Sequence, residues 1–168
     1  VGVDVIPPPS DIGNAEFVRA DIRNPVIAKV IKAAAVDTVV HMNVIATPVH
    51  AGGRSAMKEI NVIGTALVTS LSLPLMKAGG SIINTASIWG RVAEARFGAY
   101  VASKHAIIGL TKTWAKELGA SGIRVNAVCP GWVRTEASMR SLGRMAAEDG
   151  LEEAVLLEKI VGGQALPG

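Results

Sequence analysis

Hydrophobic and polar positions along the chain form blocks that predict strands separated by helices. Continuous apolar runs bounded by turn residues are typical of strands covered on both faces. Such runs occur at residues 1–6, 17–21, 37–44, 81–85 and 123–129. Helical stretches occur at residues 26–35, 55–77, 99–118, 135–148 and 151–161. Because strands and helices alternate and most loops are short, the pattern predicts an α/β fold with a doubly wound parallel sheet.

An Asn-Pro pair and a glycine predict helix boundaries in this pattern. Asn24 and Pro25 are expected to cap and open the helix at 26–35, and Gly119 to end the helix at 99–118. No repeat, low-complexity tract or linker interrupts the alternation. A chain of 168 residues is long enough for one core and too short for two ordinary ones, so we predict a single domain over residues 1–168.

The composition excludes several classes of function. Hydrophobic residues make up 49% of the chain and charged residues 18%, as in globular proteins. The net charge of +3 is scattered and aromatic residues are scarce, which argues against nucleic-acid binding. The uncharged run at 60–76 contains amide and hydroxyl side chains, so no membrane span is expected. The single Cys129 fits a reducing, cytoplasmic location, and the three histidines have no metal-ligand spacing.

Tyr100, Lys104 and Ser87 are the candidate chemical groups. Tyr100 and Lys104 are four residues apart in a predicted helix, so they project from the same face. An ammonium near a phenol favours the phenolate and lowers its pKa, which suits proton exchange with an alcohol or a carbonyl. Ser87 follows a predicted strand and could donate a hydrogen bond to a substrate oxygen. A helix-surface pair would also explain Tyr100 and Lys104 taken alone.

Three longer strings resemble the short-chain dehydrogenase/reductase family: GSIINTAS at 80–87, GAYVASK at 98–104 and RVNAVCPGWVRT at 124–135. The resemblance implies a Rossmann-type NAD(P)-binding domain that transfers a hydride between a nicotinamide and a carbonyl or secondary alcohol. It makes Tyr100 the acid/base and Lys104 the residue that lowers its pKa and binds the nicotinamide ribose. Ser87 would steady the substrate oxygen, and Asn61 would hold a water of the proton relay. Ser87 lacks the Gly-x-Ser-x-Gly elbow of hydrolases.

The resemblance also implies a set of cofactor contacts. The Pro-Gly segment that touches the nicotinamide corresponds to Pro130 and Gly131, with Val133 and Thr135 as further contacts. At residues 41–44 the sequence has His-Met-Asn-Val in place of the family's Asn-Asn-Ala-Gly motif. The resemblance makes Asn43, within this segment, a further contact with the cofactor.

Two acids are the candidate contacts with the adenosine end of the cofactor. Asp4 ends the first strand, where the family places an acid on the adenosine ribose; this acid favours NAD over NADP because it repels a 2′-phosphate. A solvated acid before a proline turn explains Asp4 equally well. Asp21 resembles the acid that contacts adenine, although an acid that caps a turn would look the same.

The sequence departs from the family in two respects. No glycine-rich phosphate loop occurs, so the first strand with that loop is expected to be missing, as is the last strand. The missing first strand belongs between the strands at 1–6 and 37–44, which must close over the gap or leave it open. In addition, residues 37–64 resemble the extended branch of epimerases and dehydratases, whereas the chain from about residue 69 resembles the alcohol dehydrogenase and ketoreductase branch.

Three functions therefore compete. The first is an oxidoreductase acting on a small carbonyl or alcohol. The second is a nucleotide-sugar epimerase or dehydratase. The third is a catalytically silent module, because in the family the helices around Asn61 and Tyr100 pack against a partner subunit; a homodimer or homotetramer is expected.

Overall fold

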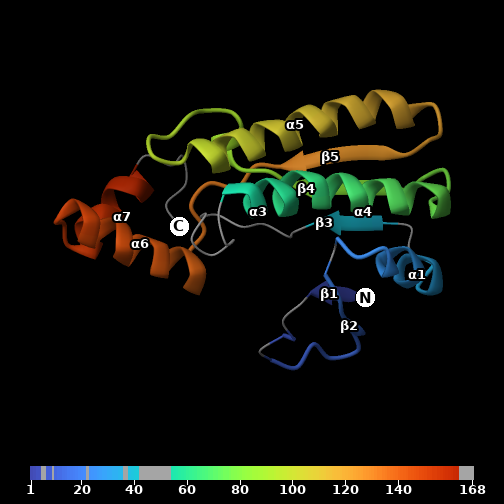
Figure 1. The fold of residues 1–168 in the computed structure, drawn as a ribbon, viewed down its shortest axis with the longest axis horizontal. Helices are drawn as coiled ribbons and strands as arrows, with labels where there is room; N and C mark the ends of the chain where they lie inside the picture. Colours follow the sequence, from blue (N-terminus) through green and yellow to red (C-terminus); the bar gives the residue numbers. More distant parts are fainter. Residues whose placement is uncertain (5–6, 9, 22, 36–37, 42–53, 163–168) are drawn as a thin grey trace. The chain divides into compact units, whose positions relative to one another are not determined.

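Parallel strands and helices alternate in the computed structural model, as the hydrophobic pattern predicts (Figure 1). The structure describes residues 1–4, 7–8, 10–21, 23–35, 38–41 and 54–162. The chain divides into two compact units, Val1–Cys129 and Pro130–Gly168. Each unit is described by itself.

The strands of the first unit form two separate parallel sheets. Strands β1 (Gly2–Asp4) and β2 (Phe17–Arg19) make one sheet. Strands β3 (Thr38–His41), β4 (Ser81–Thr85) and β5 (Arg124–Val128) make the other, in the order β3-β4-β5. Strands β1 and β3 do not pair, so the gap expected between them stays open among the described residues.

Helix α1 (Val26–Ala33) connects the small sheet to the rest of the unit. Before its start the Asn24 side chain accepts a hydrogen bond from the Val26 N–H at 2.9 Å, but the N-cap residue is Pro25, one position later than the expected Asn24. Its buried residues Ile27 and Ile31 form an apolar core with Val68, against which Val3 of β1 and Ala20, the residue after β2, also pack. Apolar contacts thus attach the β1-β2 sheet to α1.

A π-helical segment interrupts the long helix expected at residues 55–77. Helix α3 (Arg54–Lys58) continues into the π-helix η1 (Glu59–Gly64), then into α4 (Thr65–Ser72) and the 3₁₀ turn η2 (Leu73–Leu75). The prediction of one uniform helix is therefore wrong in its middle. A π segment adds a residue to one turn and is frequent at functional sites.

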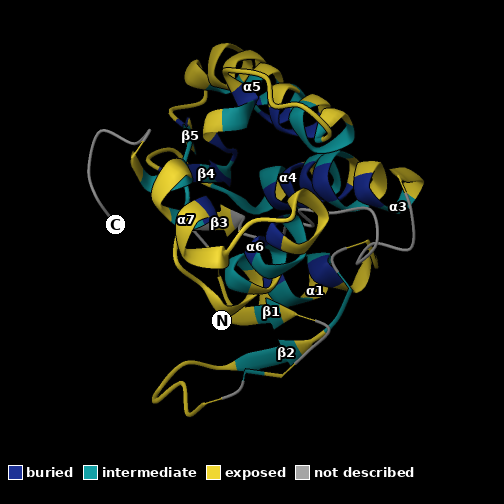
Figure 2. Ribbon diagram, turned by 90° about the vertical axis from the view of Figure 1, so that its left-hand side faces the viewer, coloured by how far each residue is buried: buried dark blue, intermediate teal, exposed yellow. Residues whose placement is uncertain are grey.

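Helix α5 (Gly98–Gly119) runs alongside β5 and also contacts β4 of the three-stranded sheet (Figure 1). Buried Ile82, Ile123 and Val125 form a core with the partly buried Trp114 and Leu118 of α5. In Figure 2 the buried positions of α4 and α5 form bands along these helices, whereas other parts of their surfaces are exposed. Along β5 only Val125 is buried and alternate residues are exposed, so one face of this strand is open within the described residues.

The left-handed turn after α5 is three residues later than expected. Gly119 is still helical, and Gly122 is the residue with a positive φ of 70°. The expectation that Gly119 adopts the terminating conformation is wrong, because the backbone reverses directly before β5. A side chain at position 122 would be strained by this φ and would approach the Ala78 Cβ to 3.2 Å.

The second unit contains helices α6 (Glu136–Asp149) and α7 (Glu153–Gly162), which pack through buried Leu142, Ala146 and Leu156. Thr135 caps α6: its Oγ1 accepts from the Ser138 N–H at 3.1 Å, while the Ser138 hydroxyl accepts from the Thr135 N–H at 2.8 Å. This reciprocal capping box satisfies two donors that a helix start leaves unpaired.

Replacing Thr135 with Ala is expected to lower the free energy of unfolding of the second unit by about 1 kcal/mol, because one capping acceptor is lost. Thermal unfolding followed by circular dichroism measures this loss. Thr135→Ser keeps the oxygen and should retain most of the stability. An unchanged stability of Thr135→Ala would show that the cap contributes nothing, and equal losses in both variants would assign the loss to the methyl group.

Candidate active site

Helix α5 places Tyr100 and Lys104 one turn apart beside the end of β4. Lys104 is only 1% exposed, although lysine is rarely buried without a partner. Its Nζ donates a hydrogen bond to the carbonyl oxygen of Thr85, the last residue of β4, at 2.7 Å. The same Nζ lies 5.5 Å from the centroid of the Tyr100 ring, a cation–π contact. The two side chains thus lie together, as their spacing predicts.

Burial dominates the electrostatics of this pair. It lowers the pKa of Lys104 from 10.5 to about 8, and nearby Cys129 opposes this shift. Burial also raises the pKa of the Tyr100 phenol above 10.0, and a hydrogen bond with the Ser87 side chain opposes this shift. The net direction is thus set by burial, and the expected lowering of the Tyr100 pKa by Lys104, whose ammonium donates to Thr85, stays a prediction.

Ser87 reaches Tyr100 from the first turn after β4. It is 8% exposed and adopts an extended conformation (φ −166°, ψ 161°) as the N-cap of the 3₁₀ turn η3 (Ile88–Gly90). Its Oγ accepts a hydrogen bond from the Trp89 N–H at 3.2 Å and shares a hydrogen bond with the Tyr100 side chain. The Trp89 N–H uses one acceptor lone pair of the Ser87 hydroxyl. The hydroxyl proton is a separate donor, which can be directed towards Tyr100 or a nearby oxygen.

Trp89 is a neighbour of Tyr100 that sequence reasoning missed. The two rings meet edge to face with centroids 5.9 Å apart, and the Trp89 ring also contacts Phe97 at 4.6 Å. Such aromatic pairs restrict ring orientation. The tryptophan, two residues after Ser87, could have been noted as a candidate from its position alone.

Asn61 lies in the π segment and connects it to α5. Its side chain is 2% exposed, and its Nδ2 donates to the Ser103 hydroxyl at 3.2 Å. Ser103 in turn donates to the backbone carbonyl oxygen of Tyr100 at 2.7 Å. The structure thus brings Asn61 to the backbone of the tyrosine through Ser103, a residue that sequence reasoning did not single out. The water-holding role of Asn61 stays a prediction.

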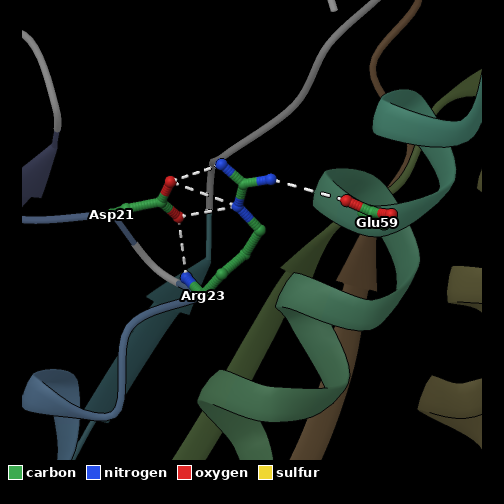
Figure 3. A network of polar contacts seen from close by, with 3 residues as sticks. All are labelled: Asp21, Arg23 and Glu59. Carbon is green, nitrogen blue, oxygen red and sulfur yellow. Dashed lines mark hydrogen bonds and ion pairs between the residues drawn. The ribbon is translucent and has the colours of Figure 1, made fainter. Parts of the chain in front are cut away.

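The acids expected at the adenosine end have different surroundings. Both Asp21 carboxylate oxygens accept from the Arg23 guanidinium, at 2.6–3.1 Å, and this side chain lowers the pKa of Asp21 (Figure 3). Arg23 also lies 3.5 Å from the carboxylate of Glu59, the first residue of the π segment. Asp4 is exposed at the end of β1 and pairs in register with Arg19. Arg23, two residues from Asp21, was missed.

The remaining predicted cofactor contacts lie outside the described residues of the first unit. Asn43 lies outside the described residues. Pro130, Gly131, Val133 and Thr135 belong to the second unit. Within that unit Thr135 is engaged as a helix cap and Val133 is 56% exposed. Their contacts with a nicotinamide remain predictions.

A membrane span and a metal-binding cluster are both absent from the part of the chain that the structure describes. No helix there is long and apolar enough to traverse a lipid bilayer. No cluster of three or more histidine, cysteine or acidic side chains with metal-binding geometry occurs there.

Comparisons with known proteins bear on the whole chain. The sequence profile of the family described as "Enoyl-(Acyl carrier protein) reductase" matches residues 12–165. The chain is 42% identical over 116 residues to D-beta-hydroxybutyrate dehydrogenase of Cupriavidus necator, an alignment that covers 65% of this chain and 45% of that protein. The chain thus spans less than half the length of this relative.

Two solved structures show the same architecture. Carveol dehydrogenase from Mycobacterium avium in complex with NAD has a TM-score of 0.78 and 29% identity, covering 90% of this chain and 61% of that chain. F189W actinorhodin polyketide ketoreductase with NADPH has a TM-score of 0.76 and 27% identity, covering 87% and 62%. Both proteins bind a nicotinamide cofactor. The separate prediction that residues 37–64 resemble the extended branch stays a prediction.

Proposed function

Because the chain belongs to the short-chain dehydrogenase/reductase family, we propose that it carries the proton-transfer site of an oxidoreductase that interconverts a carbonyl and a secondary alcohol. The supporting observation is one cluster at the end of β4, in which Ser87 bonds to the Tyr100 hydroxyl and Lys104 lies buried over the Tyr100 ring. These groups can donate a proton and stabilise a developing negative charge on one oxygen.

Because its pKa is raised, the Tyr100 phenol stays protonated at neutral pH and holds the proton that a general acid donates. In carbonyl reduction the Tyr100 hydroxyl donates its proton to the substrate oxygen, which becomes the hydroxyl of the alcohol. Ser87 donates a hydrogen bond to the same oxygen and stabilises its negative charge as it develops. In alcohol oxidation the phenolate must accept the proton, so this direction should accelerate as the pH rises towards the pKa of Tyr100.

A nicotinamide cofactor supplies or removes the hydride. The residues present fit its nicotinamide ribose: the Lys104 ammonium has three N–H donors, and its hydrogen bond to the Thr85 carbonyl oxygen uses one of them. No partner for the pyrophosphate is proposed among residues 1–168, because no glycine-rich loop occurs in them.

We propose NAD rather than NADP as the cofactor. The support is the exposed Asp4 at the end of β1, whose negative charge disfavours a 2′-phosphate. Asp21 is a weaker contact with adenine in this proposal, because Arg23 already occupies both of its carboxylate oxygens. The contacts of Asn43, Pro130, Gly131, Val133 and Thr135 with the cofactor belong to the same proposal.

Cofactor binding and turnover test the proposal together. Tryptophan fluorescence should show tighter binding of NADH than of NADPH, and absorbance at 340 nm should show NADH oxidation with a small ketone. A 3-oxo acid is the first substrate to try, given the similarity to a hydroxybutyrate dehydrogenase. Turnover of a UDP-sugar without ketone reduction would instead support an epimerase or dehydratase.

The silent module remains a second candidate because β1 and β3 do not pair, which leaves the cofactor side of the described sheets divided. Gel filtration with NAD titration separates the two proposals. A homodimer or homotetramer with no measurable affinity for NADH or NADPH would favour the silent module over the oxidoreductase.

A further inference from the structure

Gly90 is the point of closest approach between the 3₁₀ turn η3 and helix α5. A Cβ at this position would lie 2.8 Å from the Lys104 carbonyl oxygen and 2.8 Å from the Ile108 Cδ1. Real Cβ atoms do not approach backbone oxygens this closely, so any side chain would push the turn away from α5. The φ of Gly90 is not positive, so close packing explains the glycine here.

The same turn holds Ser87 in place. The Gly90 N–H donates to the Ser87 carbonyl oxygen at 2.9 Å and closes the turn, and the Trp89 N–H donates to Ser87 Oγ at 3.2 Å. On the other side of Ser87, the Ala86 N–H donates to the Val128 carbonyl oxygen of β5 at 2.8 Å. Ser87 is therefore anchored to the sheet before it and to Gly90 after it. A displacement of Gly90 passes to Ser87 through one hydrogen bond.

We propose that Gly90 is a positioning residue for the proton-transfer site: the absence of a side chain seats the turn against Lys104 and thereby sets the hydrogen bond between Ser87 and Tyr100. The inference rests on the proposed function of these residues, but it concerns a contact that exists without substrate or turnover. Gly90 acts only through Ser87, and it touches no reacting atom.

The single tyrosine of the chain makes this contact measurable. In protein labelled with ¹³Cζ-tyrosine, one resonance reports Tyr100 alone, and its chemical shift responds both to hydrogen bonding and to ionisation of the phenol. Gly90→Ala should move the neutral-pH resonance to the position found in Ser87→Ala. It should also shift the titration midpoint upward, because the Ser87 bond lowers the pKa of Tyr100.

A double-mutant cycle separates positioning from general damage. In the Ser87→Ala background, Gly90→Ala should cause no further change in either measurement. Gly109→Ala is the matched control, since a Cβ at this glycine of α5 meets nothing within 4 Å. Its resonance and midpoint should equal those of the unchanged protein.

Circular dichroism establishes that each variant is folded. Should Gly90→Ala fail to fold, Gly90→Ala/Ile108→Val removes the clash with the Ile108 Cδ1 and retains the one with Lys104, with Ile108→Val as its control. A wild-type resonance and midpoint in the folded Gly90 variant would overturn the inference, as would an additional shift on top of Ser87→Ala. An absence of turnover in the unchanged protein would contradict the proposed function, but the resonance and the titration midpoint of Tyr100 would still test the role of Gly90.

Discussion

Replacing Tyr100 with Phe is expected to lower ketone reduction by at least about 100-fold, the low end of what a positioned general acid contributes. Phe lacks the hydroxyl that donates the proton, whereas its ring keeps the edge-to-face contact with Trp89 and the contact with Lys104. The effect should fall on kcat, because the hydroxyl acts on the reacting oxygen. Steady-state rates of NADH oxidation measure it.

Cofactor affinity and fold should be nearly unchanged in this variant. Thr113→Val is the matched control, since it also removes a hydroxyl from α5, at an exposed position. It should retain the rate of the unchanged protein. Rates within a few-fold of the unchanged protein in Tyr100→Phe would show that another group supplies the proton.

Elements with a strong local pattern were predicted well from the sequence. The apolar run SIINT corresponds to β4 over the predicted residues, and the helix predicted at 99–118 corresponds to α5 within one residue at each end. In both cases the apolar pattern along the segment is enough to predict the element, so no tertiary information is needed.

The π segment could not be predicted because its cause is tertiary. Residues 55–77 have a helical pattern, and one extra residue in a turn barely changes it. The segment surrounds the buried Asn61, whose amide bonds to Ser103 on α5. The resemblance identified Asn61, but only the packed helices reveal Ser103 as its partner and the local change of helix type.

The proximity of Tyr100 and Lys104 was predicted from the sequence, whereas the directions of their pKa shifts were not. A spacing of four residues on a helix is enough to bring Tyr100 and Lys104 together. The direction of a pKa shift depends on where a flexible lysine places its ammonium and on how much solvent remains. Here Lys104 donates to the carbonyl oxygen at the end of β4, and burial outweighs every other influence on both groups.

Lys104 should also make stability depend on pH in an unusual direction. Its pKa is about 8 in the folded protein and 10.5 as an ordinary value, so the unfolded chain binds more protons between these two pH values. Stability therefore rises with pH across this window and is lowest, with respect to Lys104, below pH 8. One pKa unit corresponds to about 1.4 kcal/mol, so the full effect from 10.5 to about 8 is about 3 kcal/mol.

Lys104→Met is expected to remove this pH dependence, because methionine fills a similar volume without a titrating group. Urea unfolding of both proteins between pH 7 and 10 measures the difference in their free energies of unfolding. As the pH rises, the free energy of unfolding of the unchanged protein should increase relative to that of Lys104→Met. The titration of Tyr100 contributes to both proteins and therefore largely cancels in the difference. Lys112→Met changes an exposed lysine of the same helix and should leave the slope intact. A difference that stays constant, or falls, over this range would show that Lys104 is not buried as a destabilised cation.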